Sequence, residues 1–188
     1  MRRLLRRLIS RLYAERARLA RRRLGRRGEA WQYVLLDVAS ASHRPAGRST
    51  VAPFFAKSAD LRACPGQYWM APDGVEALLA RGDHCLAIRV DEEIAYRAFV
   101  MRDPAGVAEV AAPRGAPLPA WVVSGVYAHP AHRGCGLHAS AMAWLAGEAR
   151  RDGVRSIVAW IAEWNRSSRR AFARAGFRRL DDHPVSRT

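Results

Sequence analysis

Apolar and polar residues alternate along this chain with two different periods, which predict strands and helices in a definite order. Runs rich in β-branched and aromatic residues predict strands at Trp31–Val38, Cys85–Val90, Glu93–Met101, Ala120–Ala128 and Ser156–Trp164. Apolar positions three and four apart predict helices at Ser58–Ala63, Asp73–Arg81, Gly136–Asp152 and Arg166–Ala175. Strands first, then a strand–helix–strand–helix finish, predict a mixed α/β domain of the α+β type.

Stretches without either period are rich in proline, glycine and small residues. Residues 39–52 and 103–119 are of this kind, and both are predicted to be loops. The Pro65-Gly66 pair separates the first two helices, and Asp91-Glu92 is the expected turn of a hairpin. A single domain with short connections and two long loops is therefore expected after residue 30.

The first 30 residues have a different pattern, in which leucines at helical spacing alternate with arginines over residues 2–24. This pattern predicts a basic amphipathic helix that ends at Gly25 and Gly28. The segment holds 12 Arg against Glu15 and Glu29, a balance of +10 out of the total of +15, which leaves +5 for residues 31–188. We therefore expect an arm of residues 1–30 attached to a domain of residues 31–188.

Three partners suit such an arm. Its leucine and arginine content fits an anionic membrane surface, its charge fits nucleic acid, and its apolar stripe fits the domain itself or a second copy in a homodimer. The six tryptophans do not interleave with the arm, which weakens the nucleic-acid alternative. No stretch reaches the ~20 apolar residues of a membrane span, and no uninterrupted apolar region near the N-terminus indicates a secretory signal.

Cysteine and histidine spacing predicts neither disulfides nor a metal site. The three cysteines are widely separated and form no Cys-x-x-Cys pair. His129, His132 and His138 lie close together, but no carboxylate stands beside them at metal-ligand spacing. A reducing, cytoplasmic location is expected, with the arm able to hold the protein at the inner face of the membrane.

The segment VYAHPAHRGCGL, residues 126–137, carries the first chemical signal. A strand ends here, and Gly134 and Gly136 precede a long helix. Glycines let the backbone approach a ligand closely, and the exposed amides at a helix start bind phosphate. This turn indicates a donor substrate that bears phosphate groups.

The second signal is NRSSRRAFARAGF, which runs from Asn165 to Phe177. Together the two segments resemble the two signatures of the GNAT superfamily of acyl-CoA N-acyltransferases: Arg/Gln-x-x-Gly-x-Gly/Ala, and Asn-x-x-Ala/Ser-x-x-x-Tyr/Phe-x-x-x-Gly-Phe. The resemblance covers residues 84–177 well and residues 31–83 loosely. It implies a mostly antiparallel sheet with two splayed central strands and flanking helices.

The resemblance also implies roles for individual residues. Acetyl-CoA or another acyl-CoA is the implied co-substrate, an amine is the acceptor, and the amine attacks the thioester directly without a metal. Asn165 is implied to anchor the pantetheine arm or to hold the splay open, and Phe172 to lie beside the thioester. Pantetheine would pair with the backbone of Val126, Tyr127 and Ala128, one of whose amides would polarise the thioester carbonyl. The CoA pyrophosphate would bind the amides of Arg133, Gly134, Cys135, Gly136, Leu137 and His138.

Several positions depart from the family pattern. His138 replaces a small residue, where its ring would crowd the phosphates or, if protonated, bind them. Phe172 stands where many relatives carry a tyrosine that protonates the departing thiolate, although a thiol of pKa about 8.5 is a fair leaving group without help. The strand Ala120–Ala128 contains no carboxylate, so Glu163, a histidine or a water chain is left as the base.

Only eleven residues follow Phe177, whereas relatives have a further strand in this region. The acceptor side of the sheet is therefore expected to be open, or to be completed by another chain. An N-acyltransferase is the expected function. Two alternatives stay open: a non-catalytic CoA-binding protein, and a membrane- or nucleic-acid-associated protein that acts through its arm. The acceptor and the acyl chain length are left unnamed.

Overall fold

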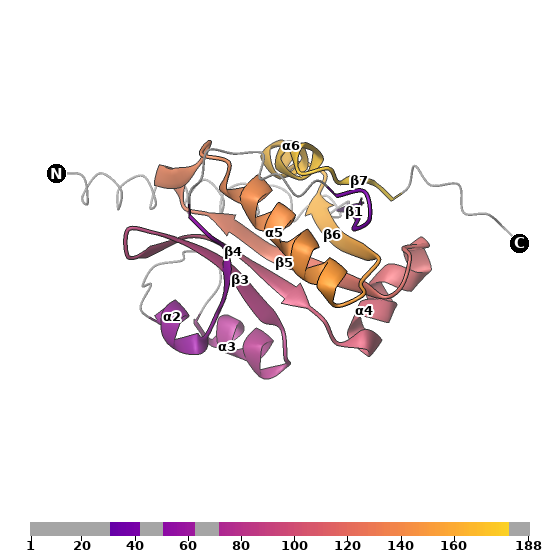
Figure 1. Cartoon of the computed structure of the whole chain (residues 1–188), viewed down its shortest axis with the longest axis horizontal. Coiled ribbons are helices and arrows are strands. Elements are labelled where there is room, and N and C mark those ends of the chain that lie inside the picture. The colour runs from indigo at the N-terminus through magenta and orange to yellow at the C-terminus, as the bar shows by residue number, and fades with distance from the viewer. Residues whose placement is uncertain (1–30, 42–50, 63–71, 181–188) are drawn as a thin grey trace, which may run out of the picture.

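The computed structural model describes residues 31–41, 51–62 and 72–180 (Figure 1). Within these residues one seven-stranded sheet has the order β2-β3-β4-β5-β6-β1-β7. Its strands are β1 (Trp31–Asp37), β2 (Phe54–Ala56), β3 (His84–Val90), β4 (Glu93–Met101), β5 (Ala120–Ala128), β6 (Ser156–Ala162) and β7 (Arg178–Arg179). Only β5 and β6 pair in parallel. The predicted mixed, mostly antiparallel sheet is thus confirmed.

Helices cover both faces of this sheet. They are α2 (Ser58–Arg62), α3 (Pro72–Ala80), α4 (Pro104–Ala111), α5 (Leu137–Arg151) and α6 (Arg166–Arg174), with 3-10 turns η1 (Ala112–Arg114) and η2 (Pro130–His132). None of these described helices has the length and apolar content needed to cross a bilayer. The predicted helix of residues 2–24 lies outside the described residues.

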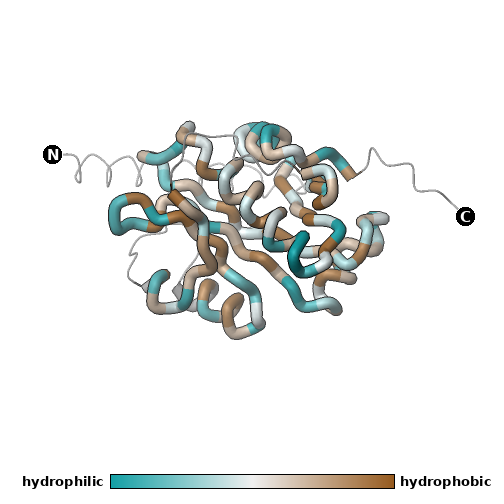
Figure 2. Tube along the Cα trace, in the orientation of Figure 1, coloured by the Kyte–Doolittle hydropathy of each residue, from teal (hydrophilic) through white to brown (hydrophobic). Residues whose placement is uncertain are grey.

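Strand alternation divides the core into clusters on the two faces. Trp121 and Val123 of β5 pack with α5 and α6, whereas their neighbour Val122 packs with α4 on the opposite face. A third cluster around Cys85 and Phe99 lies under α2 and α3. Figure 2 shows hydrophobic residues concentrated along the central strands, and Figure 1 shows α5 lying across them.

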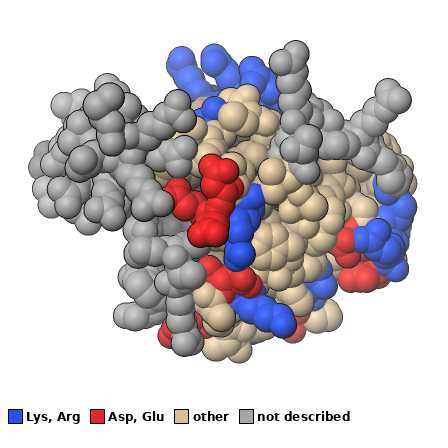
Figure 3. All heavy atoms as spheres, turned by 60° about the vertical axis from the view of Figure 1, so that its left-hand side comes forward, with Lys and Arg blue, Asp and Glu red and all other residues tan. Residues whose placement is uncertain are grey.

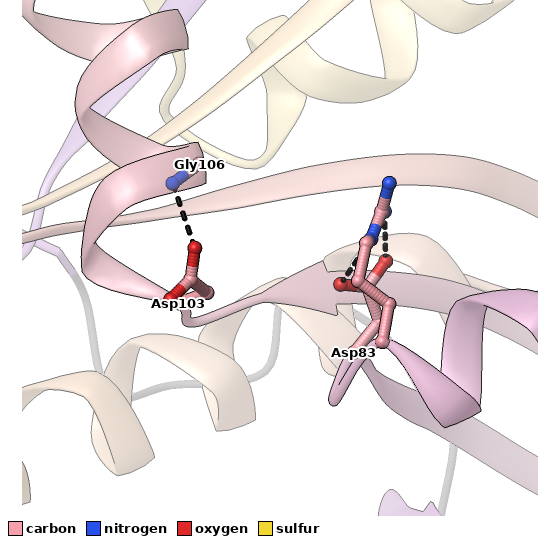
Figure 4. Close-up of polar contacts among 4 residues, drawn as sticks. Asp83, Asp103 and Gly106 are labelled. Atoms are coloured by element: carbon pink, nitrogen blue, oxygen red, sulfur yellow. Dashed lines mark hydrogen bonds and ion pairs between the residues drawn. The ribbon is translucent and has the colours of Figure 1, made fainter.

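The segment 103–119 contains α4, so the prediction that it is a loop throughout was wrong. Asp103 caps the helix by accepting a hydrogen bond from the Gly106 N–H at 2.8 Å, and Pro104 occupies the first helical turn (Figure 4). Val107 and Ala111, four residues apart, are buried against the sheet. Alanine and proline enrichment indicated a loop, but Asp-Pro before an apolar pair is a helix start.

Asp83, also drawn in Figure 4, shows how the end of α3 is joined to β3. Its carboxylate is buried and accepts a hydrogen bond from the Arg81 guanidinium at 2.5 Å. The pair also raises the pKa of Arg81. Because an unpaired buried carboxylate is costly, this contact fixes the entry of the chain into the sheet.

The two central strands diverge. β5 pairs with β6 only from Ala120 to Val123, although both strands continue beyond these pairs. On its other edge β5 follows β4 to its end, past a bulge between Ser124 and Tyr127 at which Gly125 has φ +56°. The bulge bends β5 away from β6, and this confirms the predicted splay.

The edge of β6 opposite β5 is covered by β1. Seven consecutive residues of β1, from Trp31 to Asp37, pair antiparallel with β6, and β7 then pairs with β1 at Val34 and Leu35. The expectation of an open side, or of one completed by another chain, was therefore wrong. The strand that fills this place is β1, which comes from the beginning of the described domain.

Candidate functional site

The turn between β5 and α5 presents backbone amides at the splayed end of the sheet. After β5 the chain forms η2, whose cap His129 accepts a hydrogen bond from the Ala131 N–H at 3.3 Å. The first hydrogen bond of α5 runs from the Ser140 N–H to the Gly136 carbonyl at 3.0 Å. The amides of Leu137, His138 and Ala139 therefore have no acceptor within the helix.

The glycines of this turn adopt conformations that other residues avoid. Gly134 has φ +81°, and Gly136 has φ +79° at the start of α5, where no side chain caps the helix. A Cβ on Gly134 would meet open space. An uncapped helix start with an open glycine approach is suited to an anion, because the amides and the helix dipole both favour negative charge.

Arg133 precedes Gly134, Cys135 stands between the two glycines, and both side chains are exposed. The Arg133 Nε–H donates to the Ala128 carbonyl at 3.0 Å, which ties the turn to the end of β5. Among the described residues no group of three or more His, Cys, Asp and Glu side chains could hold a metal ion.

The splay leaves one edge of β5 facing a gap in the ladder. Tyr127 and Ala128 pair with Arg97 and Tyr96 of β4, and β6 supplies no ladder partner to β5 beyond Val123. Val126 lies in the bulge. These three predicted pantetheine contacts, Val126, Tyr127 and Ala128, thus lie together where β5 separates from β6.

Asn165 lies across the gap, at the end of β6. Its Oδ1 caps α6, accepting hydrogen bonds from the Ser168 N–H at 3.1 Å and from the Ser167 hydroxyl at 2.9 Å. The carbonyl half of this side chain therefore fixes the helix start, and a contact with a bound ligand would fall to its NH₂ group. Glu163, one of the three predicted alternatives for the base, is exposed in the turn just before it.

The His138 side chain does not project into the turn between β5 and α5, residues 129–136, here called the phosphate turn after its predicted ligand. Its Nδ1 is hydrogen-bonded to the Tyr96 hydroxyl at 2.9 Å, and its ring packs edge-on against Phe172 with centroids 4.5 Å apart. Its Nε2 is buried and makes no hydrogen bond to any described residue. Burial lowers the pKa of His138 to about 4, so the ring is neutral at pH 7. A neutral ring has no charge with which to attract phosphate, so the predicted phosphate contact of His138 is left to its backbone amide.

Tyr96 is the member of this cluster that sequence reasoning missed. It is fully buried in β4, and the prediction placed it in the strand Glu93–Met101 without giving it a role. The available signal was chemical: a buried tyrosine hydroxyl needs a partner, and His138 was a bulky polar residue at a position expected to be small. Phe172 is 2% exposed and also packs on Phe177, which joins α5, α6 and the sheet beneath the splay.

The buried state of His138 predicts a pH-dependent stability. Because its folded pKa of about 4 lies below the ordinary 6.5, the unfolded chain binds the proton first as the pH falls. This contribution is fully present above pH 6.5, and we expect a loss of about 2 kcal/mol between pH 7.5 and pH 5. Urea unfolding at both pH values measures it. His138→Gln can keep a hydrogen bond to Tyr96 but cannot titrate, and equal pH dependence in both proteins would contradict the prediction.

The match to a known family decides what kind of protein carries this site. The model of the acetyltransferase (GNAT) family matches residues 52–177, more than half of the chain. The chain belongs to the GNAT family. The match includes the phosphate turn and α6, and β1 lies before it in the sequence.

Solved structures share the GNAT fold at low sequence identity. The GNAT-family acetyltransferase of Colwellia psychrerythraea has a TM-score of 0.58 at 13% identity, with 80% of this chain and 53% of that chain covered. The GCN5-related N-acetyltransferase of Sphaerobacter thermophilus has a TM-score of 0.55 at 12% identity, with 85% of this chain and 52% of that chain covered. A fungal multi-domain GH3 beta-N-acetylglucosaminidase contains a GCN5-related glucosamine N-acetyltransferase region. That structure has a TM-score of 0.58 at 11% identity, with 87% of this chain and 22% of that chain covered.

This chain thus spans about half of the first two structures and less of the third. No curated protein matches it in sequence. At these identities the likeness concerns the fold alone.

Proposed function

We propose that this GNAT chain is an acyl-CoA-dependent N-acyltransferase that transfers an acyl group, in the first instance acetyl, to an amine. The observation that carries the proposal is the coincidence of two features at one end of the sheet. β5 separates from β6 after Val123, and the uncapped start of α5 with Gly134 and Gly136 lies directly beyond β5. A thioester arm fits the first feature and its pyrophosphate fits the second.

In this proposal the chain acts mainly by binding and polarisation. The amides from Arg133 to His138 hold the pyrophosphate, and the backbone of Val126 to Ala128 pairs with pantetheine. One of these N–H groups polarises the thioester carbonyl, so that negative charge on its oxygen is stabilised while the amine attacks. The Asn165 NH₂ group contacts the pantetheine arm.

Proton transfers are the less specialised part of the mechanism. The amine attacks in its neutral form, the C–N bond forms, and the C–S bond then breaks to release the CoA thiolate. Phe172 has no proton to give, so solvent protonates the thiolate, whose pKa of about 8.5 makes this feasible. The proton of the attacking nitrogen leaves to water or to the exposed carboxylate of Glu163.

Release of free CoA thiol from acetyl-CoA in the presence of different amines tests this function. Calorimetric binding of acetyl-CoA together with amine-dependent thiol release is the expected result. A second function, CoA binding without catalysis, is favoured by one observation: Phe172 has no proton to donate, and the neutral His138 packed against it is hydrogen-bonded to Tyr96. Binding without thiol release, with every class of amine tried, would establish that second function and reject the first.

A further inference from the structure

One end of the domain gathers exposed arginines and tryptophans. From Trp164 to Leu180 the sequence has six arginines and no Asp or Glu, with the exposed Glu163 directly before this run and Asp181 and Asp182 directly after it. Arg166, Arg170 and Arg174 are exposed on α6, and Arg178 is exposed on β7. Figure 3 shows basic side chains projecting together from the top of the molecule, where Figure 1 places α6.

Two large aromatic side chains lie at the same end. Trp31 and Trp164 are each 42% exposed, and within the described residues only Leu118 is an equally exposed large apolar side chain. Trp31 pairs with Ala162, the last residue of β6, and Trp164 follows two residues later. Leu118 precedes the start of β5, so it lies at the opposite end of the sheet.

We propose that Arg166, Arg170, Arg174, Arg178, Trp31 and Trp164 form a docking surface for an anionic lipid membrane, here called the Arg/Trp face. Arginines close to anionic headgroups are attracted by about 1 kcal/mol each. Tryptophan rings prefer the boundary between headgroups and acyl chains, where one side is apolar and the other polar. The proposal does not depend on the acyltransferase activity.

The sequence that adjoins the face favours lipid over nucleic acid. Residues 1–30 enter the described domain at Trp31, so their point of attachment lies on the Arg/Trp face itself. Their sequence combines 12 Arg with leucines at helical spacing. Nucleic acid would use the arginines of such a segment but offers nothing to its apolar stripe, whereas a membrane uses both.

The position of the face gives the docking a consequence for the GNAT site. Asn165, which caps α6, directly follows Trp164. The phosphate turn begins at the end of β5, and because β5 and β6 are parallel, this is the same end of the sheet. A membrane bound at the Arg/Trp face would therefore lie beside the splay between β5 and β6.

Flotation of the full chain with vesicles of phosphatidylcholine and phosphatidylglycerol, about three to one, tests the proposal, with pure phosphatidylcholine as reference. The test variant Arg170→Gln/Arg174→Gln removes two charges from the face. The control variant Arg151→Gln/Arg155→Gln removes two exposed charges at the far end of α5 and before β6. We expect the test pair to bind these vesicles ~10-fold more weakly than the control pair, with the difference vanishing in high salt.

The double variant Trp31→Ala/Trp164→Ala is expected to weaken vesicle binding in high salt as well, because the two tryptophan rings contribute apolar contacts that salt does not screen. Thermal unfolding of each variant separates lost docking from lost folding. Equal vesicle binding by the test and control pairs would overturn the proposal. It would equally be overturned if the chain bound double-stranded DNA in preference to vesicles and the test pair lost DNA affinity instead, since the face would then serve nucleic acid.

Discussion

Gly136→Asp is expected to weaken acetyl-CoA binding by ~100-fold or more. Gly136 begins α5 with φ +79°, beside amides that have no acceptor in the helix. A carboxylate about 4 Å from a phosphate charge costs about 4 kcal/mol at the effective dielectric typical of protein surfaces. The positive φ also costs about 1–2 kcal/mol for a residue with a Cβ, but this strain is present with and without ligand and lowers the stability of the fold, not the affinity. Isothermal titration calorimetry at fixed ionic strength measures the loss.

Two matched variants separate charge from strain. Gly136→Asn has nearly the shape of the aspartate and tolerates positive φ, so it should keep affinity within about tenfold of the native protein. Gly153→Asp introduces the same residue at φ +70°, at the other end of α5, where its Cβ meets open space. It should not change binding. A folded Gly136→Asp protein that binds acetyl-CoA like the native chain would show that the phosphates lie elsewhere.

The conformation of the glycine turn between β5 and α5 was predictable from the sequence because it depends on local residues. Glycines after a strand and before a long helix define backbone geometry within a few residues, so spacing alone places the amides of Gly134 and Gly136. The Tyr96–His138 contact joins residues 42 positions apart. The packing of α5 on the sheet brings them together, and the sequence of β4 gives no sign of which of its side chains will meet the helix.

In the fold, too, local features could be predicted from the sequence and long-range ones could not. β4 and β5 have the predicted bounds because each is a mostly apolar run between polar or proline-containing turns, which is typical of a buried strand. The partner of β6 could not be deduced, since strand order depends on which edge is left uncovered after the chain collapses. β1 is seven residues long and β7 only two, so β1 has the ladder needed to cover β6. The short β2 was also missed, because three residues carry no period.

The position of β1 leads to a second large expected effect, on stability. Leu35 is 1% exposed and lies opposite Val158 of β6 in the ladder. Its side chain belongs to the cluster that includes Val107 of α4 and Val122 of β5. Leu35→Ala removes buried methyl groups where a strand, a helix and the sheet meet, so the free energy of unfolding should fall by about 3 kcal/mol. Urea unfolding followed by circular dichroism measures this loss.

Leu118→Ala is the matched control, because it makes the same chemical change at a side chain that is 42% exposed. The Leu118 side chain buries little apolar area on folding, so its truncation should change the free energy of unfolding by less than about 0.5 kcal/mol. The contrast depends on β1 being a structural part of the domain although it lies before the matched region 52–177. If Leu35→Ala were as mild as Leu118→Ala, β1 would not be packed against β6, and the edge of β6 would be free for another chain.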